Sequence, residues 1–240
     1  MPRHVLLDNV THRHTRVITR SGVQYGDSAP MVAVVPREFR QLLGVYPVFL
    51  AKDARTGEFN FVALCGFEAG ENLFLADDCW DARYVPLEIR RRPFSFGPAP
   101  GAVDDGAGDM VYIDMDSPRV QETEGERLFL EHGGQSPFLQ SINSNLAELR
   151  VGITAAKSLI ATLTTLELVE PVRLDIGLKT GEEIALQGLY TVHEEKLRGA
   201  PADIVIEMHR TGRLRELDFI FASLEQLPAL IERRNRLAIG

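Results

Sequence analysis

The sequence predicts an α+β protein with a β-rich N-terminal portion over residues 1–120, followed by helices and a second β-hairpin over residues 121–240. Short apolar runs rich in β-branched residues fill the first portion, and Asn, Gly and Pro separate them. From Ser136 the apolar period becomes helical, and a hairpin pattern returns near residue 172. We expect the two portions to form one continuous unit.

The first portion contains strands, one short helix and a well-marked hairpin. Pro36 and Gly44 are typical of the start and end of a helix. Gly57 supplies the positive φ that a turn needs between the apolar runs around it. Strands are predicted at HVLLD, TRVIT, MVAVV, YPVFLAKD, FNFVALCGF, WDARYVPLEIRRRPFSFG and MVYIDMDSP, and a surface loop at PAPGAVDDGAGD.

The second portion opens on a helical stripe formed by Leu139, Ile142, Leu146 and Leu149. Gly152 either kinks one long helix or turns a helical hairpin. Capping boxes are predicted at 191–194 and 223–226, a helix at 202–210, and either a helix or a buried strand at 218–224. The run VRLDIGLKTGEEIALQGLY predicts a hairpin that shares a TGE pattern with the first one, through chance or an internal repeat.

Charge and hydropathy exclude several classes of function. The chain has 26 Lys and Arg against 34 Asp and Glu, so its net charge of -8 disfavours nucleic acid as a partner. Apolar runs fall short of the ~20 residues that a membrane span needs, which argues against a permease. The first residues lack a secretory signal, so we expect a cytoplasmic protein; the alternative is the cell surface, reached by a non-classical export route.

Each polar motif in the sequence has a structural explanation that competes with a metal-binding or catalytic one. His12 and His14 would share a face if they lay on a strand, which makes them weak metal candidates. The arginines at 90–92 and 233–236 are typical of a solvated face or a helix end. Common nucleotide-binding, hydrolase and zinc-protease motifs are missing from the sequence, so it favours a non-enzyme and identifies no cofactor.

Several blocks together resemble one bacterial family. They are GENLF at 70–74, Trp80 with RYVPLEIRRRPF at 83–94, EGERLF at 124–129, EPVRLD at 170–175 and LYTVHEEKL at 189–197. In combination they resemble the SapC family, over nearly the whole chain. That family takes its name from a surface-layer gene cluster, so the resemblance implies a role linked to a surface layer and assigns no catalytic residues.

The sequence therefore favours a non-enzymatic, surface-layer-associated or interaction protein that binds a protein partner or a second copy of itself. The alternative is a small-molecule-binding protein or a metal-dependent accessory enzyme. Candidate ligand- or partner-binding residues carry large aromatic surfaces or groups that pair with charges. They are Glu71, Trp80, Arg83, Tyr84 and His193.

Overall fold

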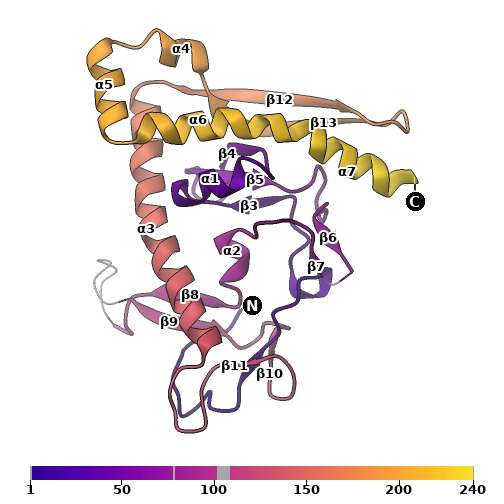
Figure 1. Cartoon of the computed structure of the whole chain (residues 1–240), viewed down its shortest axis with the longest axis vertical. Coiled ribbons are helices and arrows are strands. Elements are labelled where there is room, and N and C mark those ends of the chain that lie inside the picture. The colour runs from indigo at the N-terminus through magenta and orange to yellow at the C-terminus, as the bar shows by residue number, and fades with distance from the viewer. Residues whose placement is uncertain (1, 78, 102–108, 240) are drawn as a thin grey trace. The chain divides into compact units, whose positions relative to one another are not determined.

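The computed structural model describes residues 2–77, 79–101 and 109–239, and it confirms the α+β class (Figure 1). The predicted surface loop at 98–109 falls largely on residues 102–108, which lie outside the described part. The first half contains β1 (His4–Leu6), β2 (Arg16–Val17), η1 (Val23–Tyr25), β3 (Met31–Ala33), η2 (Pro36–Glu38), α1 (Phe39–Leu42), β4 (Val48–Lys52), β5 (Phe59–Leu64), β6 (Leu75–Ala76), β7 (Cys79–Trp80), α2 (Leu87–Arg90), β8 (Phe94–Gly97) and β9 (Met110–Asp114). The second half contains β10 (Val120–Gln121), β11 (Glu126–Arg127), α3 (Pro137–Thr165), β12 (Val169–Gly177), β13 (Glu183–Val192), α4 (Glu194–Arg198), α5 (Ala202–Arg210), α6 (Arg213–Ser223), η3 (Leu224–Gln226) and α7 (Leu227–Ile239).

The chain divides into two compact units that are interleaved along the sequence. Unit 1 comprises residues 1–27, 75–80 and 87–150, and unit 2 comprises residues 28–74, 81–86 and 151–240. The sequence predicts a β-rich portion up to residue 120 and a portion with helices and a hairpin after it. That boundary is not the boundary between these two units, and it stays a prediction. Among the described residues, no helix combines the length and the apolar character of a membrane span.

Unit 1 is built from small antiparallel sheets and the first half of α3. One sheet has the order β1-β9-β8 and another β10-β2-β11, while β6 and β7 form a separate pair. Its core contains Phe94, Ile113 and Leu128, each 0% exposed. Leu139 and Leu146 of the predicted α3 stripe join this core, so burial of one helix face explains why the stripe exists.

Unit 2 contains one five-stranded antiparallel sheet with the order β12-β13-β4-β5-β3. The β4–β5 pair is the first predicted hairpin, and Gly57 in its turn has a φ of 72°. The second predicted hairpin is the long β12–β13 pair, whose register shifts between Val172 and Leu174. Both predicted hairpins are therefore confirmed; whether they are related copies stays a prediction.

The long helix α3 is continuous, which selects one long helix over a helical hairpin at Gly152. An added Cβ on Gly152 would lie 2.4 Å from Cγ2 of Val35, so the glycine permits close packing in unit 2. Residues 213–223 are helical, which selects the helical alternative for the apolar run DFIFASL.

Two local predictions are wrong. The segment 80–97 is not one strand, because Pro86 precedes the helical turn α2 and only Phe94–Gly97 pairs with β9. Neither capping box forms: His193, not Thr191, caps α4, with its Nδ1 accepting from the backbone N–H of Lys196 at 3.4 Å. Ser223 instead accepts from the N–H of Val48 at 3.0 Å.

Candidate functional site

The residues predicted to bind a ligand are divided between the two units. Trp80 belongs to unit 1, where it is 9% exposed and pairs with Leu75 across β6–β7. Glu71, Arg83, Tyr84 and His193 belong to unit 2. Within that unit the contacts of Glu71, Tyr84 and His193 described below are made to different residues, and the binding role of the set stays a prediction.

Tyr84 is held in a buried hydrogen-bonded chain. Its hydroxyl donates to Oε1 of Glu38 at 2.9 Å, and its carbonyl accepts from the hydroxyl of Tyr46 at 2.6 Å. Glu38 and Tyr46 are 1% and 0% exposed. Arg83 lies beside this chain in the sequence but is itself exposed, with Nη2 placed against Gly44. The contacts of Tyr84 stabilise unit 2 from within.

Glu71 and His193 have local structural partners. Oε2 of Glu71 accepts from the N–H of Phe67 at 2.7 Å, while Oε1 lies 2.9 Å from Nε of Arg234. Nε2 of His193 lies 3.8 Å from Oε2 of Glu170, and its other ring nitrogen caps α4. Both side chains therefore organise loops and helix ends.

The two histidine candidates for a metal site lie in different environments. Residues 9–14 form turns rather than a strand, so the expected shared face is absent. His12 is 2% exposed, with Nδ1 accepting from the N–H of Asp8 at 3.2 Å, whereas His14 is exposed. Within the described residues, no group of three or more His, Cys, Asp or Glu side chains is arranged to hold a metal.

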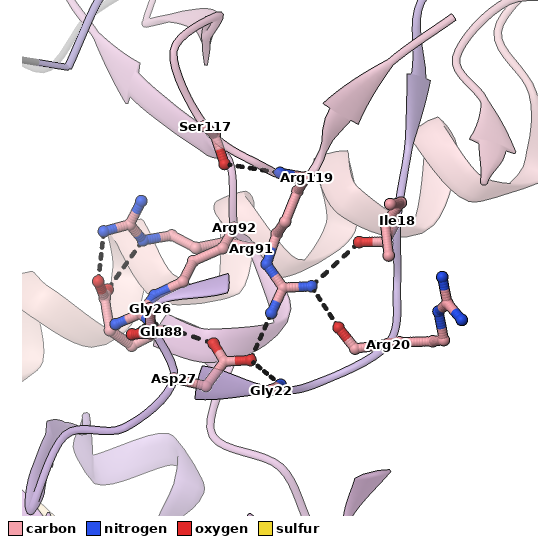
Figure 2. Close-up of polar contacts among 10 residues, drawn as sticks. All are labelled: Ile18, Arg20, Gly22, Gly26, Asp27, Glu88, Arg91, Arg92, Ser117 and Arg119. Atoms are coloured by element: carbon pink, nitrogen blue, oxygen red, sulfur yellow. Dashed lines mark hydrogen bonds and ion pairs between the residues drawn. The ribbon is translucent and has the colours of Figure 1, made fainter. Parts of the chain in front are cut away.

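A cavity in unit 1 that three arginines line provides a stronger candidate site. It has a volume of about 630 Å³, and we call it the arginine cavity. Its lining includes Tyr25, Glu88, Arg91, Arg92, Asp116 and Arg119. Segments far apart in the sequence supply these side chains, and Figure 2 shows the polar contacts of Glu88, Arg91, Arg92 and Arg119.

Asp27 organises the arginine cavity from beneath. It is 0% exposed, and its Oδ2 lies 2.5 Å from Nη2 of Arg119. Its other oxygen lies 3.3 Å from Nη1 of Arg92, and the N–H of Gly22 also donates to Oδ2 at 3.0 Å (Figure 2). A buried carboxylate with these partners fixes both guanidinium groups in position.

Arg119 is held on several sides, yet one of its donors has no acceptor. Nη1 donates to the carbonyls of Ile18 at 3.0 Å and Arg20 at 2.7 Å, and the guanidinium lies 4.9 Å from the ring centre of Tyr25. The Nε–H is buried and has no hydrogen-bond partner among the described residues. Buried donors are normally paired, so this atom indicates a missing acceptor.

The remaining donors of the cavity are on Arg92. Its Nη1 donates to the carbonyl of Gly26 at 2.7 Å and faces Asp27, whereas Nε and Nη2 have no acceptor within the described part of the chain. The Arg92 side chain is 28% exposed, so solvent or a ligand reaches it. Nε and Nη2 share one edge of the planar guanidinium, which matches two oxygens of a carboxylate or phosphate.

Of the three carboxylates that line the cavity, Glu88 and Asp116 are paired with arginines, and Asp114 accepts from the backbone N–H of Arg3 at 2.8 Å. Both oxygens of Glu88 accept from Arg91, with Nε at 2.8 Å, and Nη1 of Arg91 donates to the carbonyl of Phe94. Asp116 pairs with Nε of Arg3 at 3.3 Å. An incoming anion therefore meets the free guanidinium edge of Arg92, beside the positive charge of Arg119 and next to two carboxylates that arginines already pair with.

Sequence reasoning found only part of this site. Arg91 and Arg92 directly follow the end of α2, as the helix-end alternative predicted, and their side chains are only 25% and 28% exposed, so the alternative of a solvated face does not describe them. Asp27 and Arg119 were missed, because a lone Asp beside Gly26 has the composition of a surface turn. Neither residue carries a local signal of its partner 92 positions away.

The family can be assigned with the fold and cavity described. The sequence profile of the SapC family matches residues 7–230. The chain belongs to the SapC family. The family match thus confirms the resemblance seen in the sequence blocks. No curated protein sequence and no solved structure shows a significant match to the chain.

Proposed function

We propose that this SapC-family protein is a non-catalytic binding protein, associated with a surface layer, that holds an acidic group of its ligand in the arginine cavity. The observation that carries the proposal is the unoccupied guanidinium edge of Arg92, formed by Nε and Nη2, beside the fixed guanidinium of Arg119. Both arginines are anchored by Asp27, so their donors are positioned before a ligand arrives.

The pairing within the cavity favours holding a ligand over chemical catalysis. Glu88 is bound on both oxygens by Arg91, and Asp27 is bound by two arginines. Proton transfer requires an acid or base that can change partners, whereas fixed charge pairs provide a rigid, charge-matched surface. The ligand class that fits is a small molecule or chain end bearing a carboxylate or a phosphate.

Calorimetric titration with inorganic phosphate and with acetate tests the cavity. We expect saturable binding to the wild-type protein, and Arg92→Gln should weaken it about ten-fold or more, since it removes charge-assisted hydrogen bonds. The matched control is Arg90→Gln, because Nη2 of Arg90 donates to Asn145 at 2.9 Å and the residue is not part of the cavity lining. Equal weakening by both variants, or no binding to the wild type, contradicts the proposal.

The link to a surface layer is a separate part of the proposal and rests on the gene cluster that gave the family its name. Protease treatment of intact cells of the source bacterium, followed by immunoblotting, tests location. Degradation before lysis supports export to the surface. Full protection places the protein inside the cell, where its surface-layer role would be that of an intracellular partner. Co-purification with the surface-layer protein, lost on mutation of Arg92, would connect the location to the cavity.

A further inference from the structure

One edge of the five-stranded sheet in unit 2 is long, and no strand in the described part of the chain pairs with its outer side. This edge is β12, the first strand in the order β12-β13-β4-β5-β3 (Figure 1). It extends over nine residues, whereas β3 at the opposite edge has three. The free backbone groups of such an edge are a template for pairing with another strand. The β12 edge is therefore a candidate interaction surface.

Contacts at the two ends of β12 show which of its backbone groups face outward. The carbonyl of Leu168 accepts from the N–H of His193, which follows β13, at 2.7 Å. The N–H of Leu178 donates to the carbonyl of Glu182, just before β13, at 2.8 Å. The extra residue at the register shift belongs to β13, where Gly188 has a φ of 84°, so the alternation along β12 is unbroken. Even-numbered residues of β12 thus bond to β13, and odd-numbered residues face outward.

Pro171 limits the part of this edge that can pair. It stands at an outward position and has no backbone N–H, as is typical of an edge strand. Beyond it, Arg173, Asp175 and Gly177 each direct an N–H and a carbonyl outward, and within the described residues no backbone group bonds to them. The side chains of Arg173 and Asp175 are 61% and 67% exposed, and Nε of Arg173 donates to Oδ1 of Asp175 at 2.8 Å.

We propose that two copies of the chain pair antiparallel through β12, with Leu174 on the two-fold axis, so that their sheets join into one. In this register Arg173 lies opposite the partner's Asp175, and the symmetry repeats the pair on the other side of the axis. The opposed residues exchange both backbone hydrogen bonds, and opposite charges on directly opposed residues stabilise a strand pair. The exposed ion pair within one chain is thereby replaced by ion pairs between chains.

Charge selects this register over its neighbours. Outward residues must oppose outward residues, so the axis can shift only by whole residues. Moving the axis to Arg173 places two arginines opposite each other, and moving it to Asp175 does the same to two aspartates. Like charges that are directly opposed are destabilising. The sequence of this edge is therefore complementary to itself when the axis is at Leu174.

The other contacts of the proposed register are also compatible. On the face that packs inward, Leu174 lies opposite its own copy and Val172 lies opposite the partner's Ile176, so these cross-strand pairs are apolar. Pro171 lies opposite the partner's Gly177 and needs only its carbonyl, which accepts from the glycine N–H. This surface belongs to unit 2 and includes no residue of the arginine cavity, so it is independent of the proposed anion site.

Reciprocal charge variants test the pairing by sedimentation velocity from about 1 µM to 1 mM protein, a range that covers weak interfaces. The wild-type chain should dimerise with rising concentration. Arg173→Asp and Asp175→Arg should each raise the dimer dissociation constant about ten-fold or more, since each places like charges opposite each other. An equimolar mixture of the two variants should dimerise again, because one chain then presents carboxylates on this edge and the other presents guanidinium groups.

Arg210→Asp and Glu207→Arg are the matched controls. They make the same changes in net charge at an ion pair of α5, whose side chains are 74% and 57% exposed. Both should dimerise as the wild type does, and circular-dichroism melting verifies that all four variants are folded. The inference is overturned if the wild type stays monomeric over the whole range, if the controls weaken the dimer as much as the edge variants do, or if the mixture stays monomeric.

A cysteine on the proposed axis tests the register. The background is Cys79→Ser, which removes the exposed native thiol. Leu174→Cys should cross-link to its own copy on oxidation, because directly opposed residues of a non-hydrogen-bonded pair have Cα atoms about 4.5 Å apart. Val172→Cys is the control, since its copy would lie four residues further along the strand, about 13 Å away. Equal cross-linking of the two variants, or none in Leu174→Cys, contradicts the register.

Discussion

At the scale of single residues, Asp27 holds the two arginines on which the arginine cavity depends. It pairs with Arg119 and Arg92, which lie 92 and 65 positions away in the sequence. Local sequence patterns cannot contain such pairs, so sequence reasoning assigned Arg92 to a helix end and passed over Asp27. The same limit applied to Glu71, whose carboxylate contacts Arg234 of α7.

Asp27→Asn should be strongly destabilising. The substitution leaves the Arg119 guanidinium, 5% exposed, without its counter-charge, and removal of one partner of a buried pair costs about 3–5 kcal/mol. Urea denaturation measures the loss of unfolding free energy. Asp116→Asn is the control: it breaks a pair whose side chains are 63% and 50% exposed, so it should cost less than ~1 kcal/mol. Equal costs for the two variants would refute the structural role of Asp27.

Arg234→Gln should destabilise unit 2 by about 1–2 kcal/mol. Arg234 is 19% exposed, and its Nε lies 2.9 Å from Glu71 as an ion pair rather than an aligned hydrogen bond. Nη2 also lies 3.4 Å from Glu68 and 4.0 Å from Glu182, so one side chain connects α7 to two loops. Thermal melting measures the effect. Arg236→Gln, at an exposed position of α7, should leave the melting temperature nearly unchanged.

At the scale of elements, the sequence predicts structure where the determinants are local. Gly57 and Gly181 both adopt positive φ in the turns of the two hairpins, and these hairpins are where predicted. The capping box predicted at Thr191 does not form, because Thr191 takes part in the pairing of two long strands instead. Thr191 is paired with Glu170 across β12–β13, so the strand extends to Val192 and the cap moves to His193.

The close approach of α3 to Val35 makes a prediction about Gly152. In a helix interior Ala is favoured over Gly by about 1 kcal/mol, but the new Cβ would lie 2.4 Å from Cγ2 of Val35. We therefore expect Gly152→Ala to destabilise unit 2. Val35→Ala removes the obstructing methyl groups, so in the double variant Gly152→Ala should no longer be harmful. A double-mutant cycle from urea denaturation measures this coupling; additive effects would show that the contact is relaxed without cost.

At the scale of the whole molecule, the two units are connected by repeated passages of the chain. It passes between them at residues 27/28, 74/75, 80/81, 86/87 and 150/151. The last passage lies inside α3, whose residues 137–150 belong to unit 1 and whose residues 151–165 belong to unit 2. Neither unit is a continuous stretch of sequence, so composition and periodicity along the chain contained no signal of this division.

The interleaved chain predicts that the two units unfold in one cooperative transition. If one half of α3 unfolds, the helical turn at the junction loses its hydrogen bonds and the other half must begin with a new, unpaired helix end, which couples the units through α3. Trp80, the single tryptophan, reports on unit 1 through its fluorescence, whereas α5, α6 and α7 of unit 2 contribute to the far-UV circular dichroism. In urea the two midpoints should coincide in the wild type, and both should shift together in Asp27→Asn. A shift confined to the fluorescence midpoint would show that unit 1 unfolds separately.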